Sequence, residues 1–251
     1  LIIIGYFFKL TFFESYTGDR FGYNGLLISS ATSSYFHFCI MGHLFLKLKE
    51  NYLKNYMVLF ILITSLLVGT KSIYILDFIF IFMYLYLFVS SRKIKFYGLF
   101  LLAVMFISFS YYLLFFWPIF RNIVTKRGFL NAILSDRNKI FISETFPFLK
   151  EKWNVVNFLF GGIKNISLRP QLGLADLFLF FGIIGSFLFF YSLYISLQKD
   201  LRLKIIPFFL ICIISLLMLT TGNFFINTSV CIYAVAFYYA VLKHQLNENK
   251  N

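Results

Sequence analysis

Long apolar runs alternate with short polar segments along this chain. A hydrocarbon core ~30 Å thick is crossed by ~20 apolar residues in a helix, and only helices or closed barrels satisfy their backbone groups inside lipid. Barrel strands alternate apolar and polar residues, whereas these runs are continuous. The complete runs are residues 25–46, 57–69, 72–89, 96–116, 175–195, 206–221 and 224–242. The pattern predicts an all-α integral membrane protein, a polytopic helical bundle with seven complete spans.

An eighth run, residues 1–13, is too short for a complete span. Neither an initiator Met nor the charged start of a signal peptide precedes it. We interpret it as a partial span, the end of a truncated helix. We therefore expect residues 1–251 to form a single polytopic membrane domain and to be the C-terminal part of a longer protein.

Basic residues are unevenly distributed among the segments that connect the runs. Every second connection is rich in Lys and Arg, which is typical of the cytoplasmic side. These connections contain Lys47, Lys49 and Lys54, then Arg92, Lys93 and Lys95, then Lys199, Arg202 and Lys204, and finally Lys243 and Lys250. The alternation predicts a cytoplasmic C-terminus and places the longest connection, residues 117–174, on the periplasmic or extracellular side.

This outer loop, residues 117–174, contains nine basic residues and three acidic ones, a net charge of nine minus three, or +6. Its apolar positions favour a helix in the membrane interface over residues 119–134. A second helix is predicted over residues 136–145 and should end at Pro147. A basic segment of this kind suits an anionic, lipid-linked substrate held at the membrane face.

Composition narrows the class of protein further. Hydrophobic residues make up 60% of the chain and charged residues only 13%, which is too apolar for a soluble domain of this length. The formal net charge of +13 suits an anionic membrane surface or anionic ligands, and we expect no nucleic-acid partner. Cys39, Cys212 and Cys231 lie inside apolar runs without metal-ligand spacing. We expect neither a metal nor a cofactor.

Two polar features lie inside predicted spans. Asp77 is costly in lipid and should face the bundle interior, either as a functional group or paired with a Lys or Tyr of a neighbouring helix. Ser30, Ser34 and His37 follow one another at helical spacing and share one face. Hydrogen bonds between helices explain this stripe without any catalysis.

Three stretches combine glycines with charged residues. They are Gly-Asp-Arg-Phe-Gly-Tyr-Asn at residues 18–24, Gly-Thr-Lys-Ser at residues 69–72, and Arg137 followed by Phe-Gly-Gly at residues 160–162, Asp176 and Gly-Ile-Ile-Gly at residues 182–185. In this order and at these places in the membrane they resemble the O-antigen polymerase (Wzy) and O-antigen ligase superfamily. The resemblance covers about residues 18–195.

The resemblance implies a processive, metal-independent glycosyltransferase at the outer face of the bacterial inner membrane. A growing glycan on one undecaprenyl diphosphate moves to the terminal hydroxyl of a lipid-linked repeat unit of O-antigen or capsule. The implied partners are undecaprenyl-diphosphate-linked oligosaccharide, the lipid bilayer and a chain-length regulator protein. Lys71 stands where the family usually has Arg, and the outer loop lacks the His that ligases place there. A polymerase is therefore preferred to a ligase.

Two other classes of function stay open. A flippase or transporter for the same lipid-linked unit would need basic residues across the membrane depth, whereas here they gather in the outer loop. A non-catalytic membrane partner in chain assembly is disfavoured only by the charge of that loop.

The resemblance also implies which residues act on the substrate. Negative charge developing on a lipid diphosphate is stabilised by cations in a partly dry site. The predicted substrate-binding residues are Arg20, Arg137 and Arg169, with Lys71 in support. A carboxylate must take the proton of the acceptor hydroxyl. The available carboxylates are Asp176, Glu144, Asp136 and Asp19, of which Asp176 is preferred because it lies at the mouth of the next helix.

Each of these charges also has a structural interpretation. Arginines and lysines at helix ends extend toward the membrane surface and anchor the helix there. Asp176 in a first helical turn would complement the helix dipole.

Overall fold

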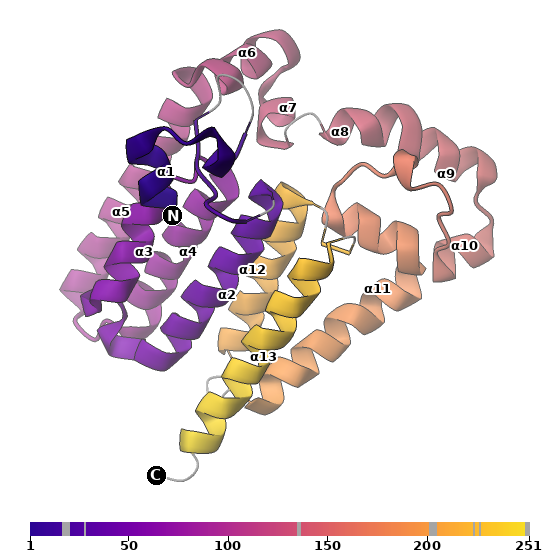
Figure 1. Cartoon of the computed structure of the whole chain (residues 1–251). Coiled ribbons are helices and arrows are strands. Elements are labelled where there is room, and N and C mark those ends of the chain that lie inside the picture. Colours follow the sequence, from indigo (N-terminus) through magenta and orange to yellow (C-terminus); the bar gives the residue numbers. More distant parts are fainter. Residues whose placement is uncertain are drawn as a thin grey trace. The chain divides into compact units, whose positions relative to one another are not determined.

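A computed structural model of the chain describes residues 1–16, 21–27, 29–134, 137–200, 205–222, 224–225 and 227–248. These residues are mostly helical and contain no strand beyond one antiparallel bridge between Glu14 and Tyr23. The all-α prediction is therefore confirmed for this part of the chain. The chain forms two compact units, Leu1–Ile119 with Ser229–Asn251 (unit 1) and Phe120–Thr228 (unit 2), whose helices are labelled in Figure 1.

Unit 1 contains the helices of the partial run and of the first four complete runs, together with the last helix of the chain. They are α1 (Ile2–Phe8), η1 (Thr11–Phe13), α2 (Ser30–Leu48), η2 (Lys49–Lys54), α3 (Tyr56–Leu66), α4 (Lys71–Phe88), α5 (Arg92–Phe115) and α13 (Thr228–Glu248). Helix α4 packs against α2, α3 and α5. Its Phe80 and Met83 are fully buried, and the ring of Phe80 lies 5.8 Å from that of Phe45 in α2.

Three helices among the described residues are long and apolar enough to cross a membrane: α4, α5 and Gly173–Ser196 of α11. Helix α3 and the apolar parts of α12 and α13, Phe208–Thr221 and Thr228–Ala240, are shorter. These helices support a membrane protein, whereas the count of seven spans stays a prediction. The first complete run becomes helical only at Ser30, because the side chain of Ser29 accepts the N–H of Thr32 and caps α2 there.

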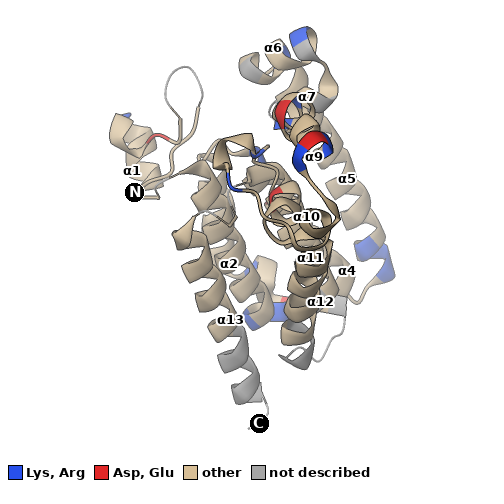
Figure 2. Cartoon of the chain, turned by 90° about the vertical axis from the view of Figure 1, so that its right-hand side faces the viewer, with Lys and Arg blue, Asp and Glu red and all other residues tan. Residues whose placement is uncertain are grey.

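Unit 2 contains the helices of the outer loop and the two that follow it. They are α6 (Pro118–Arg127), α7 (Phe129–Leu134), α8 (Arg137–Ile140), η3 (Phe141–Thr145), α9 (Phe146–Lys152), α10 (Val155–Phe160), η4 (Ile166–Leu168), α11 (Gly173–Asp200) and α12 (Ile205–Thr221). Leu149, Ile163 and Leu179 form one of its buried hydrophobic clusters. Figure 2 shows charged residues along α9, whereas residues 177–198 of α11 contain none.

The helices of the outer loop differ from the predicted pair in two places. Gly128, at φ +89°, separates α6 from α7, so that residues 119–134 do not form one helix. Pro147 does not end a helix, because it lies in the first turn of α9. The π-helical turn η3 directly precedes α9, with the N–H of Phe146 bonded to the carbonyl of Phe141, and such an interruption of the usual ladder allows the helical path to continue through Pro147 to the end of α9.

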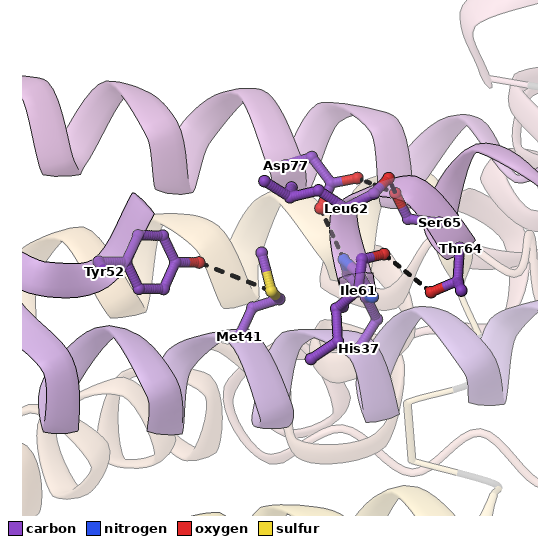
Figure 3. Close-up of polar contacts among 8 residues, drawn as sticks. All are labelled: His37, Met41, Tyr52, Ile61, Leu62, Thr64, Ser65 and Asp77. Carbon is purple, nitrogen blue, oxygen red and sulfur yellow. Dashed lines mark hydrogen bonds and ion pairs between the residues drawn. The ribbon is translucent and has the colours of Figure 1, made fainter. Parts of the chain in front are cut away.

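A buried polar network joins three helices of unit 1 (Figure 3). His37 of α2 lies 2.7 Å from Asp77 of α4, with the imidazole N–H donating to the carboxylate, and Ser65 of α3 donates to the other carboxylate oxygen at 2.5 Å. One helical turn away, the hydroxyl groups of Ser34 and Ser72 lie 2.9 Å apart. Interhelical bonding is thereby confirmed for Ser34 and His37 of the α2 stripe. The expected Lys or Tyr partner of Asp77 is wrong, since His37 and Ser65 occupy that place.

Candidate functional site

Three of the predicted site residues come together in unit 2. Arg137 is the first residue of α8, Arg169 directly follows η4, and Asp176 lies in the first turn of α11. Both arginines interact electrostatically with the Asp176 carboxylate. The fold therefore unites side chains that are separated by up to 39 positions, 176 minus 137.

Arg137 is held at the carboxyl end of α12. Its Nη1 donates to the carbonyl oxygen of Thr220 at 2.8 Å and its Nη2 to that of Thr221 at 2.9 Å. The last carbonyl groups of a helix have no partner within the helix and carry partial negative charge. The guanidinium satisfies two of them at once, which orients its plane.

Arg169 and Asp176 form a buried pair of opposite charges. Their side chains are 4% and 1% exposed, and Nε of Arg169 lies 3.6 Å from Oδ1 of Asp176. This distance is too long for a hydrogen bond; the carboxylate charge is stabilised by the nearby guanidinium groups of Arg169 and Arg137 and by the backbone N–H of Gln171. The Arg169 guanidinium also lies over the ring of Phe180, 5.9 Å from its centroid.

Tight backbone packing closes the cluster between α11 and α12. Gly222 ends α12 at φ +63°, and a Cβ there would collide with the carbonyl of Gln171 and lie 3.3 Å from Nη1 of Arg137. A Cβ at Gly173 would lie 2.8 Å from the carbonyl oxygen of Met218. Glycine at both places allows α12 to approach the start of α11. The Thr-Thr-Gly end of α12, residues 220–222, was not among the site residues predicted from the sequence.

Glu144, the second predicted catalytic residue, makes no hydrogen bond or ion pair with this cluster among the described residues. It is exposed on η3. The buried neighbour Thr145 points the other way, and its hydroxyl donates to the carbonyl of Leu168 at 2.7 Å. Thr145 thus ties η3 to the residue before Arg169, a role that the sequence did not suggest.

Lys71 belongs to unit 1, where it is the first residue of α4 and is half-buried. The turn before it is joined to the N-terminal segment: the N–H of Tyr23 donates to Leu67, and the hydroxyl of Ser15 donates to Val68 at 2.8 Å. Gly69 of the second stretch lies against Phe21 and Gly22 of the first. Arg20, Asp19 and Asp136 lie outside the described residues.

Comparison with protein-family models, with curated proteins and with solved structures found no match. The resemblance to the O-antigen polymerase superfamily stays a prediction, and the function has to be argued from the geometry. Among the described residues, no group of three or more His, Cys, Asp and Glu side chains is placed to hold a metal ion.

Proposed function

We propose that this chain is the catalytic membrane part of a polysaccharide polymerase. It would transfer a growing glycan from undecaprenyl diphosphate to a lipid-linked repeat unit. The observation that carries the proposal is the meeting of Arg137, Arg169 and Asp176 at the start of α11. Two guanidinium groups and one carboxylate are the side chains that transfer from a diphosphate leaving group to a hydroxyl needs.

In the proposed reaction the acceptor hydroxyl oxygen attacks the anomeric carbon of the donor glycan. The bond from that carbon to the diphosphate oxygen breaks, and its electron pair leaves with the lipid diphosphate. Arg137 and Arg169 stabilise this charge, since a planar guanidinium pairs with two phosphate oxygens at once. The hydroxyl proton passes to the carboxylate of Asp176.

The membrane setting belongs to the same proposal. Seven complete spans and one partial span would form the bundle in a bacterial inner membrane, with the C-terminus in the cytoplasm and residues 117–174 outside. Arg20 and Lys71 would add cations for the diphosphate or glycan, and Glu144 is the alternative base. A chain-length regulator protein is the expected partner.

The test uses the full-length protein in a strain deleted for its gene, with surface polysaccharide separated on a gel. Asp176→Asn and Arg169→Lys should both reduce polymer strongly, and Glu151→Gln, an exposed carboxylate change in α9, should leave the ladder intact. Lys71→Arg should be tolerated better than Lys71→Glu. Wild-type ladders from Asp176→Asn would refute the assigned base.

The gel also separates the alternative functions. A strain lacking a polymerase places single repeat units on the lipid core, whereas a strain lacking a ligase or flippase places no glycan there. The second outcome would overturn the proposal. Purified full-length protein that fails to extend polyprenyl-diphosphate-linked repeat units in vesicles would also overturn it.

A further inference from the structure

Helix α11 is broken at Gly182, six residues after Asp176. Gly182 has φ +65° and ψ −168°, a backbone conformation outside the helical region. In an unbroken helix the carbonyl of Leu179 would accept the N–H of residue 183. Here that carbonyl accepts the N–H groups of Gly162 and Ile163, at 3.1 and 3.2 Å. A segment of the outer loop thus occupies the hydrogen-bonding position that the break leaves open.

The two backbones cross so closely that neither can carry a side chain at the crossing. A Cβ at Gly161, which has φ +78°, would collide with the carbonyl group of Phe180 and lie 2.6 Å from the nitrogen of Phe181. A Cβ at Gly182 would collide with the carbonyl of Leu159 and lie 2.5 Å from the nitrogen of Gly161. Two positive φ values and two backbone collisions make glycine obligatory at both positions.

The crossing lies directly behind the charged cluster. Phe180, whose carbonyl faces Gly161, is the residue whose ring lies under Arg169, and Leu179 packs on Ile163 and Leu149 in a buried cluster of unit 2. The first part of α11, from Gly173 to the break, therefore presents Asp176 and Phe180 to Arg169 in a direction set by the crossing.

We infer that the backbone crossing of Gly161 and Gly162 with the break at Gly182 positions Asp176 and Phe180 around Arg169. The three glycines are positioning residues, and the segment that follows α10 is mechanically joined to the site. With alanine at residue 182, α11 would favour an unbroken helix, which turns Asp176 away and releases the Gly162 segment. The effect on glycan transfer rests on the proposed function, whereas the geometry of the crossing does not.

Trp153 offers a spectroscopic measurement of the crossing that needs no enzymatic activity. Its ring lies 5.4 Å from that of Phe178 in α11 and 5.3 Å from that of Phe158 in α10. The chain has two Trp residues, so Trp117→Phe leaves Trp153 as the sole indole. Loss of the crossing should shift its emission to the red and make it more accessible to acrylamide.

The variants are Gly161→Ala and Gly182→Ala, with Gly128→Ala as the matched control. Gly128 also has a positive φ, +89°, but a Cβ there meets nothing within 4 Å, so it reports backbone strain without a collision. Both crossing variants should show the Trp153 change and lower the transfer rate on the order of 100-fold, since small misplacements of reacting groups have that effect. Gly128→Ala should change neither.

A double substitution separates positioning from general destabilisation. In an Arg169→Lys background, Gly182→Ala should lower transfer by less than about twofold more, since residues acting through one contact are not additive. If Gly182→Ala does not purify as a folded protein, Asn157→Ala can replace it. This substitution removes the 3.2 Å hydrogen bond from Nδ2 of Asn157 to the Gly161 carbonyl and should loosen the crossing less than Gly182→Ala does.

The inference is wrong if the crossing variants match Gly128→Ala in Trp153 quenching, or if Trp153 changes while transfer keeps its wild-type rate. It is also wrong if Gly182→Ala and Arg169→Lys act additively. A wild-type protein that transfers no glycan would refute the proposed function alone, because the Trp153 comparison would still decide whether the crossing exists.

Discussion

Replacing Asp77 by Leu removes the acceptor at the centre of the network that joins α2, α3 and α4. Asp77 and His37 are each 8% exposed, so an N–H left without an acceptor there cannot turn to water. Ser65 keeps an acceptor, because its hydroxyl lies 2.7 Å from the carbonyl of Leu62. Only His37 is then orphaned, and we expect Asp77→Leu to lower the free energy of unfolding by ~1–3 kcal/mol.

The pair of substitutions His37→Leu and Asp77→Leu gives the sharper test. Replacing both partners by apolar side chains removes the orphaned group and is often nearly neutral. The double variant should therefore be more stable than Asp77→Leu alone. We expect a coupling energy of about 0.6–1.7 kcal/mol, between the average and the maximum measured for hydrogen bonds between membrane helices. Ser65→Ala should cost ~0.5–1.5 kcal/mol.

The assay is reversible unfolding in mixed micelles by titration with sodium dodecyl sulfate, followed by circular dichroism. Ser192→Ala serves as the control, since Ser192 makes a similar bond to the Phe189 carbonyl on an exposed helix face, and it should change stability by less than ~0.5 kcal/mol. If His37→Leu and Asp77→Leu prove additive, the network does not hold the three helices together and the reasoning fails.

Three further predictions concern packing and topology. Arg137→Gln should lower the free energy of unfolding by ~1–3 kcal/mol, because two carbonyl groups at the end of α12 lose a charged donor; equal stability in a denaturant titration would contradict the capping role. Gly69→Ala should cost more than ~2 kcal/mol, since its φ of +70° and a facing carbonyl exclude a Cβ. Gly98→Ala, which meets only a flexible Leu side chain at 3.2 Å, should cost far less in the same titration. Cysteine at Asn154 should react with an impermeant reagent from outside, and cysteine at Asn51 should not; the reverse labelling would invert the topology.

The helical class of the protein could be predicted because its causes are local. Continuous apolar runs of membrane length favour helices wherever they lie, and each predicted run has a helix in the structure. The ends of the helices depend on caps, glycines and prolines, which the hydropathy pattern does not describe. Ser29 caps α2, Gly128 divides α6 from α7, and Pro147 is accepted within a first helical turn.

The residues of the candidate site could be named from the sequence, but their partners could not. Asp77 was expected to find a Lys or Tyr, and its partner is His37, 40 positions away. Arg137 was expected to bind substrate, and it also caps α12 at Thr220, 83 positions away. These pairings depend on which faces of distant helices meet, which no local periodicity encodes.

The glycines of unit 2 also separate what the sequence indicates from what the tertiary structure decides. Gly161, Gly162 and Gly182 entered the sequence analysis only as parts of the stretches that carry the resemblance, and nothing in the run from residue 175 to 195 indicated that α11 breaks within it. The break exists because another backbone crosses there and takes over the Leu179 carbonyl. Apolar runs define helices through their own residues, whereas breaks, caps and buried pairs arise only where separate segments satisfy each other's polar groups.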